Sequence, residues 1–179
     1  NNVEIAKMLI NHPKIDLNMK NDGNKNAAFL SIYMNDDTIL KFLIDKGNSD
    51  ALLYYSIKLM NGIGVEINKE ESMKYLMAAI DKGNTKALMK YGEMLENGNQ
   101  FPIDKEKANQ LFKKAADMGN DEAMIKYSMN LLNKIKNSDD IKEGLKYCQM
   151  AVEKENEIAI YLYINLLKIC KEIGFDAKD

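Results

Sequence analysis

Cysteine and histidine are almost absent from this chain, which contains two cysteines and one histidine in 179 residues. Two cysteines cannot form a disulfide framework, and the single histidine, His12, lies far from both in the sequence. Cys148 falls in an apolar helical pattern and Cys170 at an expected helix end, so we expect a core thiol and a surface thiol. No metal ligand and no cofactor are predicted.

Long apolar runs and an excess of one charge are missing as well. The longest apolar stretch, residues 158–167, is about half the length that a bilayer requires and contains Asn165. The chain carries 25 basic and 27 acidic residues, and the lysines of residues 105–114 are interleaved with acidic ones. These features predict no membrane and no nucleic-acid partner. With no signal-peptide pattern, we expect a cytoplasmic, intracellular protein.

Patterns typical of catalysis are also missing. The glycines of residues 61–65 lack the lysine of a phosphate-binding loop. The acidic pairs at residues 70–71 and 139–140 stand where helices are expected to begin, so they favour the helix dipole. No serine, cysteine or lysine has the context of an activated nucleophile. We therefore predict no catalytic residues and expect that the chain is not an enzyme.

What the sequence does contain is an internal repeat with a step of 36 residues. Three residue types follow this step: Ala51, Ala87, Ala123 and Ala159; Tyr55, Tyr91, Tyr127 and Tyr163; Leu59, Leu95, Leu131 and Leu167. A fixed period of this length indicates one supersecondary unit that is stacked on copies of itself.

Each unit is predicted to be a pair of helices. Apolar residues recur at helical spacing over residues 87–98 and again over residues 105–118, and Asp104 offers a side-chain cap for the second helix. Tyr91 and Ala115 lie on the apolar stripes, so we expect both to be buried between consecutive helices. The chain is therefore predicted to be all-α.

The second copy resembles the Sel-one-like repeat (SLR) family, whose members are tetratricopeptide-related helical hairpins. The match rests on Ala87, Gly92, Gly98, Asp104, Lys107, Ala108, Lys114, Ala115, Ala116 and Gly119. This resemblance implies a right-handed α-solenoid of antiparallel helix pairs, with an SLR region over residues 48–179. Its units are expected at about 48–83, 84–119, 120–155 and 156–179. The third has Lys134 and Lys136 in place of the loop glycines, and the fourth stops where its second helix should begin.

Residues 1–47 follow a different pattern, which resembles about one and a half ankyrin repeats. Residues 4–18 are similar to the second helix and following turn of such a repeat, and residues 21–48 are similar to a complete one, although residues 25–28 replace the usual Thr-Pro-Leu-His. No spacer rich in proline, glycine or serine follows. We expect the ankyrin-like segment and the SLR region to join through a shared helix.

The resemblance implies a binding surface, because the first helices of tetratricopeptide-like repeats line the concave side of the stack. The residues mapped to that side are Leu53, Ile57, Met60, Asn61, Met89, Glu93, Glu96, Asn97, Ile125, Met129, Leu132, Asn133 and Tyr161. We predict a methionine-containing groove whose asparagines bond a peptide backbone and whose glutamates suit an apolar and basic segment. Its apolar members should then form one exposed strip. The alternative is that some of them complete the packing between neighbouring helices.

The function that follows is a non-catalytic scaffold or adaptor that binds protein or peptide partners. SLR proteins act as scaffolds, and the resemblance implies the same for this chain. An alternative is a regulatory or substrate-recruiting arm of a larger multidomain protein, for example a kinase, whose catalytic domain lies outside residues 1–179. A third reading, an architectural spacer, predicts that no partner binds.

Overall fold

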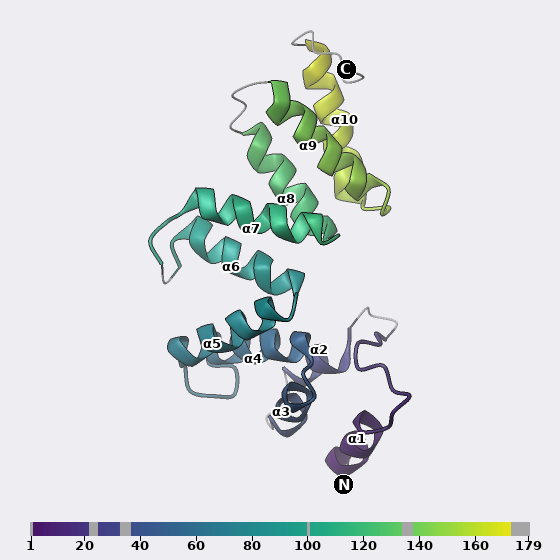
Figure 1. Cartoon of the computed structure of the whole chain (residues 1–179), viewed down its shortest axis with the longest axis vertical. Helices are drawn as coiled ribbons and strands as arrows, with labels where there is room; N and C mark the ends of the chain where they lie inside the picture. Colours follow the sequence, from purple (N-terminus) through teal and green to yellow (C-terminus); the bar gives the residue numbers. More distant parts are fainter. Residues whose placement is uncertain (1, 22–24, 33–36, 100, 134–137, 173–179) are drawn as a thin grey trace. The chain divides into compact units, whose positions relative to one another are not determined.

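The chain folds into helices throughout the part that the structure describes. The computed structural model describes residues 2–21, 25–32, 37–99, 101–133 and 138–172. The helices are α1 (Asn2–Ile10), α2 (Ala27–Ser31), α3 (Thr38–Asp45), α4 (Ser49–Asn61), α5 (Lys69–Asp81), α6 (Thr85–Asn97), α7 (Lys105–Asp117), α8 (Asp121–Leu132), α9 (Ser138–Val152) and α10 (Glu157–Glu172) (Figure 1). Among the described residues, extended backbone pairing is limited to one bridge between Lys20 and Asn26. The predicted all-α solenoid is confirmed.

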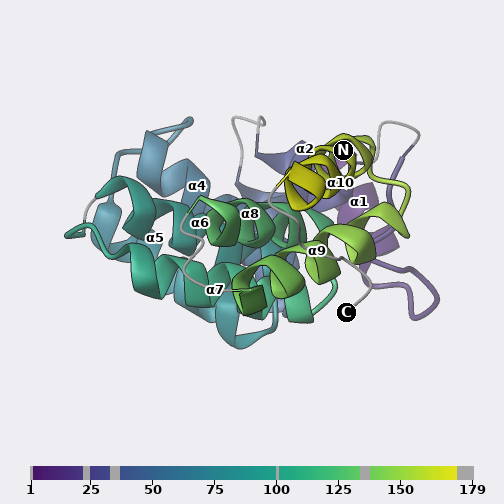
Figure 2. The same ribbon diagram turned by 90° about the horizontal axis from the view of Figure 1, so that it is seen from above.

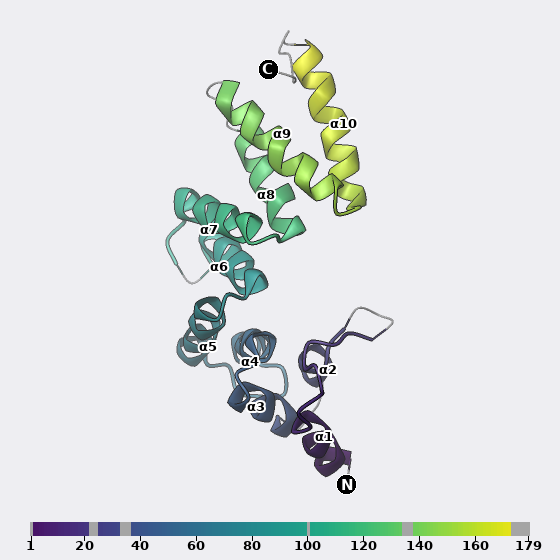
Figure 3. The same ribbon diagram turned by 45° about the vertical axis from the view of Figure 1, so that its right-hand side comes forward.

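The chain divides into two compact units, residues 1–87 and residues 88–179. In the first unit, α4 and α5 pack as a hairpin. In the second, α8 packs against α9, and α9 in turn packs against α10, as Figures 1 and 3 show from two sides. Figure 2 shows α9 and α10 from above. The turns expected at Gly23 and between Lys134 and Lys136 lie outside the described residues.

Each repeat ends in the same backbone turn. Gly47, Gly83 and Gly119 have φ values of 79°, 77° and 88°, in the left-handed region that glycine adopts without a Cβ clash. The residue after each glycine then donates its N–H to a carbonyl five residues earlier, as Asn84 does to Ala79 at 3.0 Å. This pattern satisfies the carbonyl groups at the helix end. It also sets the position from which the next helix begins.

The asparagine that follows this turn makes two kinds of hydrogen bond. Asn48, Asn84, Asn120 and Asn156 each accept a hydrogen bond on the side-chain oxygen from the N–H three residues later, at 2.8–3.2 Å. The side-chain nitrogen of Asn84 donates to Asp50 at 2.7 Å, and that of Asn156 donates to Asp121 at 2.6 Å. In these two cases one amide caps its own helix and bonds to the start of the first helix of the preceding repeat.

Small residues lie where the two helices of a repeat cross. In the first repeat, the buried hydroxyls of Ser56 on α4 and Ser72 on α5 are 3.0 Å apart. In the third, the hydroxyl of Ser128 on α8 donates to the backbone carbonyl of Gly144 on α9. The short side chains let the helix backbones approach closely, and their hydroxyls have partners despite full burial.

In the second repeat a glycine and a phenylalanine occupy this crossing. Gly92 on α6 stands one period after Ser56, and a Cβ atom built on it would lie 2.5 Å from the Phe112 ring on α7. Phe112 is fully buried, and it stands where Leu76 occurs one period earlier and Cys148 one period later. Phe112 is the largest of the three residues at its position on the second helix. Gly92 is the smallest of the three at its position on the first helix, so the two sizes compensate.

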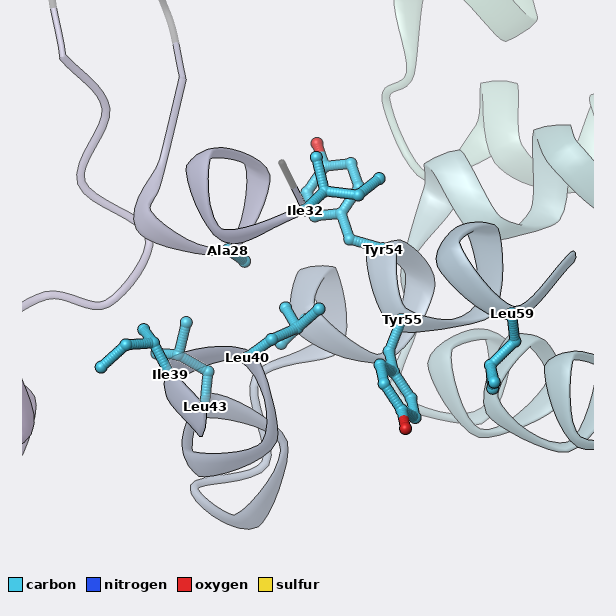
Figure 4. Packing of buried hydrophobic residues seen from close by; sticks show 9 residues of the cluster. Ala28, Ile32, Ile39, Leu40, Leu43, Tyr54, Tyr55 and Leu59 are labelled. Carbon is cyan, nitrogen blue, oxygen red and sulfur yellow. The ribbon is translucent and has the colours of Figure 1, made fainter. Parts of the chain in front are cut away.

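The N-terminal helices and the first repeat share one hydrophobic core. Its buried members are Ala28, Ile32, Ile39, Leu40, Leu43, Ala51, Tyr54, Tyr55 and Leu59 (Figure 4). Phe29 meets Tyr54 edge-on with ring centroids 5.4 Å apart. Lys58 on α4 is completely buried and forms an ion pair with Asp37, the residue before α3. Removing Asp37 would take an opposite charge away from a fully buried ammonium group, which is costly.

Two expectations about burial need correction. Cys170 was expected at the surface, but it is buried in the core of the second unit with Ile141, Leu145, Cys148 and Leu166. The reason is that α10 continues past this position, so Cys170 lies inside a helix and faces that core. Ala115 is fully buried as predicted, whereas Tyr91 is only half-buried and packs edge-on against Phe101.

The turn at the end of α9 predicts a stabilising substitution. Glu155 takes the place of the repeat-end glycines, with a φ of 61°, and it is the only non-glycine residue in the described ranges with positive φ. A left-handed conformation costs a residue with a Cβ roughly 1–2 kcal/mol. We therefore expect Glu155→Gly to raise the free energy of unfolding by about 1 kcal/mol in urea titrations. The control Glu153→Gly, two residues earlier, should give no gain.

The crossing of α6 and α7 predicts an energetic coupling. Gly92→Ser should destabilise the chain by roughly 1–3 kcal/mol, because the new side chain meets the rigid Phe112 ring. Phe112→Leu reproduces the residue of the first repeat and should relieve that clash. The double variant should then be more stable than the sum of the two single changes predicts. Additive effects in urea unfolding would contradict this account of the crossing.

Candidate functional site

A cleft of about 420 Å³ opens in the second unit between α6, α7 and α8. We call it the amide cleft, and its lining residues are Glu96, Asn97, Lys105, Asn109, Lys126, Met129, Asn130 and Asn133. Four of the eight are asparagines, whose side chains both donate and accept hydrogen bonds. Four of the eight also belong to the predicted concave face: Glu96, Asn97, Met129 and Asn133.

The thirteen predicted residues differ widely in their exposure. Leu53, Met89 and Ile125 are buried; Ile57, Met60, Glu93, Glu96 and Leu132 are half-buried; Asn61, Asn97, Met129, Asn133 and Tyr161 are exposed. The expected strip of eight exposed apolar residues is therefore wrong. Only Met129 and Tyr161, at 44% and 71% exposure, meet that expectation.

The correction has a physical cause in the packing of the first helices. Residues 51–56 of α4 are all buried, which requires neighbours on every side of the helix. Leu53 lies within this run, and Ile125 lies in a similar buried run, residues 123–125 of α8. Ile57 packs against the N-terminal core, and Leu132 packs against the core of the second unit. For these positions the alternative of inter-helix packing is the correct one.

Charges within the amide cleft are largely paired. Glu96 on α6 forms a 2.7 Å ion pair with Lys126 on α8, and the side-chain nitrogen of Asn130 lies 3.5 Å from the same carboxylate. Glu93 lies outside the cleft lining and has Lys90 at 3.9 Å. The two glutamates predicted to attract a basic ligand thus already have lysine partners.

Asn109 is the feature of the amide cleft that sequence reasoning missed. It lies on α7, and its Oδ1 atom is buried without a hydrogen-bond partner among the described residues. A buried acceptor that lacks a donor is uncommon in folded proteins. Asn109 directly follows Ala108 of the apolar stripe in the sequence. This adjacency is the signal from which a position facing the neighbouring repeat could have been predicted. The pairing of α7 with α8 could not be read from one helix alone.

A second hollow, of about 440 Å³, lies in the first unit and is mainly apolar. Its lining comes from α1, the following turn, α2 and α3: Ala6, Leu9, Ile10, Ile15, Asp16, Leu17, Met19, Ala27, Leu30, Ser31 and Ile39. Met19, which lines the hollow, is strongly exposed, and so is Met8 on α1. The sequence pattern of residues 1–47 did not indicate this hollow.

A polar network joins α7, α8 and α9 next to the core of the second unit. The Lys113 ammonium donates to the Tyr147 hydroxyl at 3.0 Å, pairs with Glu143, and lies 5.1 Å from the Tyr127 ring centroid. Burial, followed by the charge of Glu143, raises the pKa of Tyr127 to about 12. Burial and the hydrogen bond to Asp117 raise the pKa of Tyr147. These groups keep their protons at neutral pH and stabilise the fold.

The reactive side chains do not assemble into a catalytic or metal site in the ranges that the structure describes. No group of three or more His, Cys, Asp or Glu residues there could hold a metal ion. Burial raises the pKa of the Cys148 thiol to about 11, and it also raises the pKa of Cys170. Neither thiol is therefore a nucleophilic thiolate at neutral pH.

None of the helices in the described ranges combines the length and the apolar character that crossing a bilayer demands.

Comparison with known proteins agrees with the repeat pattern. The sequence matches the Sel1 repeat family at residues 49–84, 85–120 and 122–156, which together make up more than half of the chain. No curated protein matches the sequence. The matched ranges begin within a residue or two of α4, α6 and α8, so each contains one helical hairpin.

Two solved structures show the same fold. A Sel1 repeat protein from Oxalobacter formigenes superposes with a TM-score of 0.66 at 23% identity, over 74% of this chain and 99% of that one. A protective antigen of uropathogenic Escherichia coli that displays an SLR fold gives a TM-score of 0.63 at 16% identity, over 78% of this chain and 29% of that one. Likeness at these identities establishes the solenoid fold and leaves the ligand open.

Proposed function

The chain belongs to the Sel1 repeat family, and we propose that it is a non-catalytic adaptor that binds an extended peptide segment of a partner protein in the amide cleft. Sel1 repeats generally mediate interactions between proteins, which is the coarse function of the family. The observation that carries the finer proposal is the gathering of four asparagine side chains around one exposed methionine.

The side chains of the cleft suit a peptide backbone. Each peptide unit presents one N–H donor and one carbonyl acceptor, and an asparagine side chain can meet both. Asn97 and Asn133 are exposed at the cleft, and Asn109 is part of its lining. Asn130 on α8 is a further amide of the lining, so α6, α7 and α8 each contribute an asparagine to the cleft.

Met129 supplies the apolar contact for a ligand side chain. It is 44% exposed, and its flexible thioether adapts to side chains of different shape. Because Glu96 is paired with Lys126, and Lys105 adds a second positive charge, the cleft has no acidic excess. We therefore propose a ligand with one apolar side chain that contacts Met129. The other contacts are hydrogen bonds between the asparagines and the ligand backbone. A requirement for basic residues is not part of this proposal.

The N-terminal segment is proposed to be an ankyrin-like cap on the repeats. Lys20 and Asn26 form an antiparallel bridge ahead of α2, and α2 and α3 pack against each other as a helix pair would. At five residues, α2 is short for such a module. An intracellular site of action also belongs to the proposal, since Cys148 and Cys170 share one core as free thiols.

The proposal predicts that one methionine matters for binding and another does not. Peptides selected from a displayed library of unstructured segments of about 16 residues, which span roughly 50 Å when extended, should bind the chain in fluorescence anisotropy. Met129→Glu should weaken that binding about tenfold or more, since it places a charge at the apolar contact. Unfolding free energy should change by about 0.5 kcal/mol or less, because the side chain is exposed.

Met118→Glu is the matched control. Met118 lies at the end of α7 with 46% exposure, nearly equal to that of Met129, but outside the cleft lining. Its replacement should leave the affinity unchanged. Asn133→Ala should weaken binding through lost backbone contacts. Peptides that bind both methionine variants with wild-type affinity would place the site elsewhere, with the apolar hollow of the first unit as the next candidate.

A further inference from the structure

One face of α10 is exposed along its whole length. Seven residues at helical spacing form this face, which we call the α10 stripe: Glu157, Ile160, Tyr161, Ile164, Leu167, Lys168 and Lys171. All seven are exposed, while Ala159, Leu166 and Cys170 on the other side are buried. The helix is therefore packed on one side only, and its open side is apolar in the middle.

The same positions are covered in the earlier repeats. Ile160 stands one period after Met124 and further periods after Leu88 and Leu52, and those three residues are all buried. The first helix of a repeat is covered by the second helix of the same repeat, as α5 covers α4 and α9 covers α8. The α10 stripe is thus the kind of surface that another helix covers.

The centre of the α10 stripe differs from its counterparts in size. Ile164 stands where Ser56, Gly92 and Ser128 occur in the earlier repeats, and those small residues allow the close crossing of the two helices of a hairpin. An isoleucine holds a neighbouring helix farther away. The stripe is therefore poorly matched to the second helix of an ordinary repeat.

Charges are placed symmetrically about this isoleucine. Glu157 lies seven residues before Ile164, and Lys171 lies seven residues after it. Neither Glu157, Lys168 nor Lys171 forms an ion pair with any residue in the described ranges. A stripe that is acidic at one end, apolar in the middle and basic at the other is complementary to itself when two copies run in opposite directions.

We propose that the α10 stripe pairs with the α10 stripe of a second copy of this chain, antiparallel about a twofold axis that passes Ile164. In this register Glu157 faces Lys171 of the second copy, and Tyr161 faces its Leu167. Ile160 faces Lys168 of the second copy, whose methylene chain packs on it while the ammonium group stays in water. Each contact occurs twice, as an isologous interface requires. The surface is separate from the amide cleft, so the pairing does not depend on peptide binding.

The affinity of such a pair is modest. A helix of 16 residues is about 24 Å long, and one helix face buries less than the roughly 1,600 Å² of a standard interface. We expect a dissociation constant on the order of 10–100 μM. Sedimentation velocity of the 179-residue chain, from about 5 to about 500 μM, should therefore show a reversible monomer–dimer equilibrium.

Charge reversal tests the register. Glu157→Lys should raise the dissociation constant about tenfold, because each lysine then faces Lys171, and Lys171→Glu should do the same by placing two carboxylates together. An equal mixture of these two variants should form a heterodimer, since every facing pair is again opposite in charge. The double variant should recover the wild-type dissociation constant. Only an antiparallel, symmetric pair behaves in this way.

Three further variants show whether a change in the dissociation constant comes from the α10 stripe itself, from loss of folding or from an unrelated change of charge. Ile164→Ser, which reproduces the residue of the first and third repeats, should raise the dissociation constant without loss of helical circular dichroism. Glu122→Lys, an exposed reversal on α8, should leave the dissociation constant unchanged. Met129→Glu should also leave it unchanged, so a failure of peptide binding and a failure of dimer formation can be told apart.

Three results would overturn the proposal. The first is a chain that stays monomeric throughout the concentration range. The second is a dimer that persists unchanged in Ile164→Ser and Glu157→Lys. The third is a monomeric chain whose α10 stripe binds an added labelled peptide of residues 69–81, because a helix of the ordinary repeat type would then be the partner that covers it.

Discussion

An asparagine amide stands at the start of each repeat, and the beginning of each first helix depends on it. The asparagines at positions 48, 84, 120 and 156 cap the helix that they precede, and the nitrogen atoms of Asn84 and Asn156 bond to the start of the helix one repeat earlier. Since the oxygen and nitrogen of an amide are fixed relative to each other, both helix starts are fixed as well.

This constraint extends to the segment before the repeats. The side-chain nitrogen of Asn48 lies 3.2 Å from the side-chain oxygen of Asn18, and Asn26 donates to Asp50, which also accepts from Asn84. Asp50 therefore receives hydrogen bonds from both sides along the chain. Together with the buried pair of Lys58 and Asp37, these bonds join residues 1–47 to the first repeat without a linker.

Helices and their ends could be predicted from the sequence because their signals are local. Asp104 caps α7 as expected, and Gly119 ends the following turn in the left-handed region. The binding face could be predicted only in part, because exposure depends on neighbours that one helix does not reveal. Met129 and Ile125 lie one turn apart on α8, yet only Met129 reaches solvent. The contribution of α7 to the amide cleft, through Asn109, depends on the packing of helices from different repeats.

The matched sizes at the helix crossings limit how such a protein can change. Ser56 meets Ser72, Gly92 meets the Phe112 ring, and Ser128 meets Gly144, so each first helix suits the second helix of its own repeat. A recombination within a hairpin, joining α4 to α7, would bring a phenylalanine to a crossing that holds a serine. Duplication or loss of a whole hairpin leaves every pair intact. In this chain a repeat can therefore be gained or lost without disturbing a helix crossing only as a whole hairpin, with its boundaries at the capping asparagines.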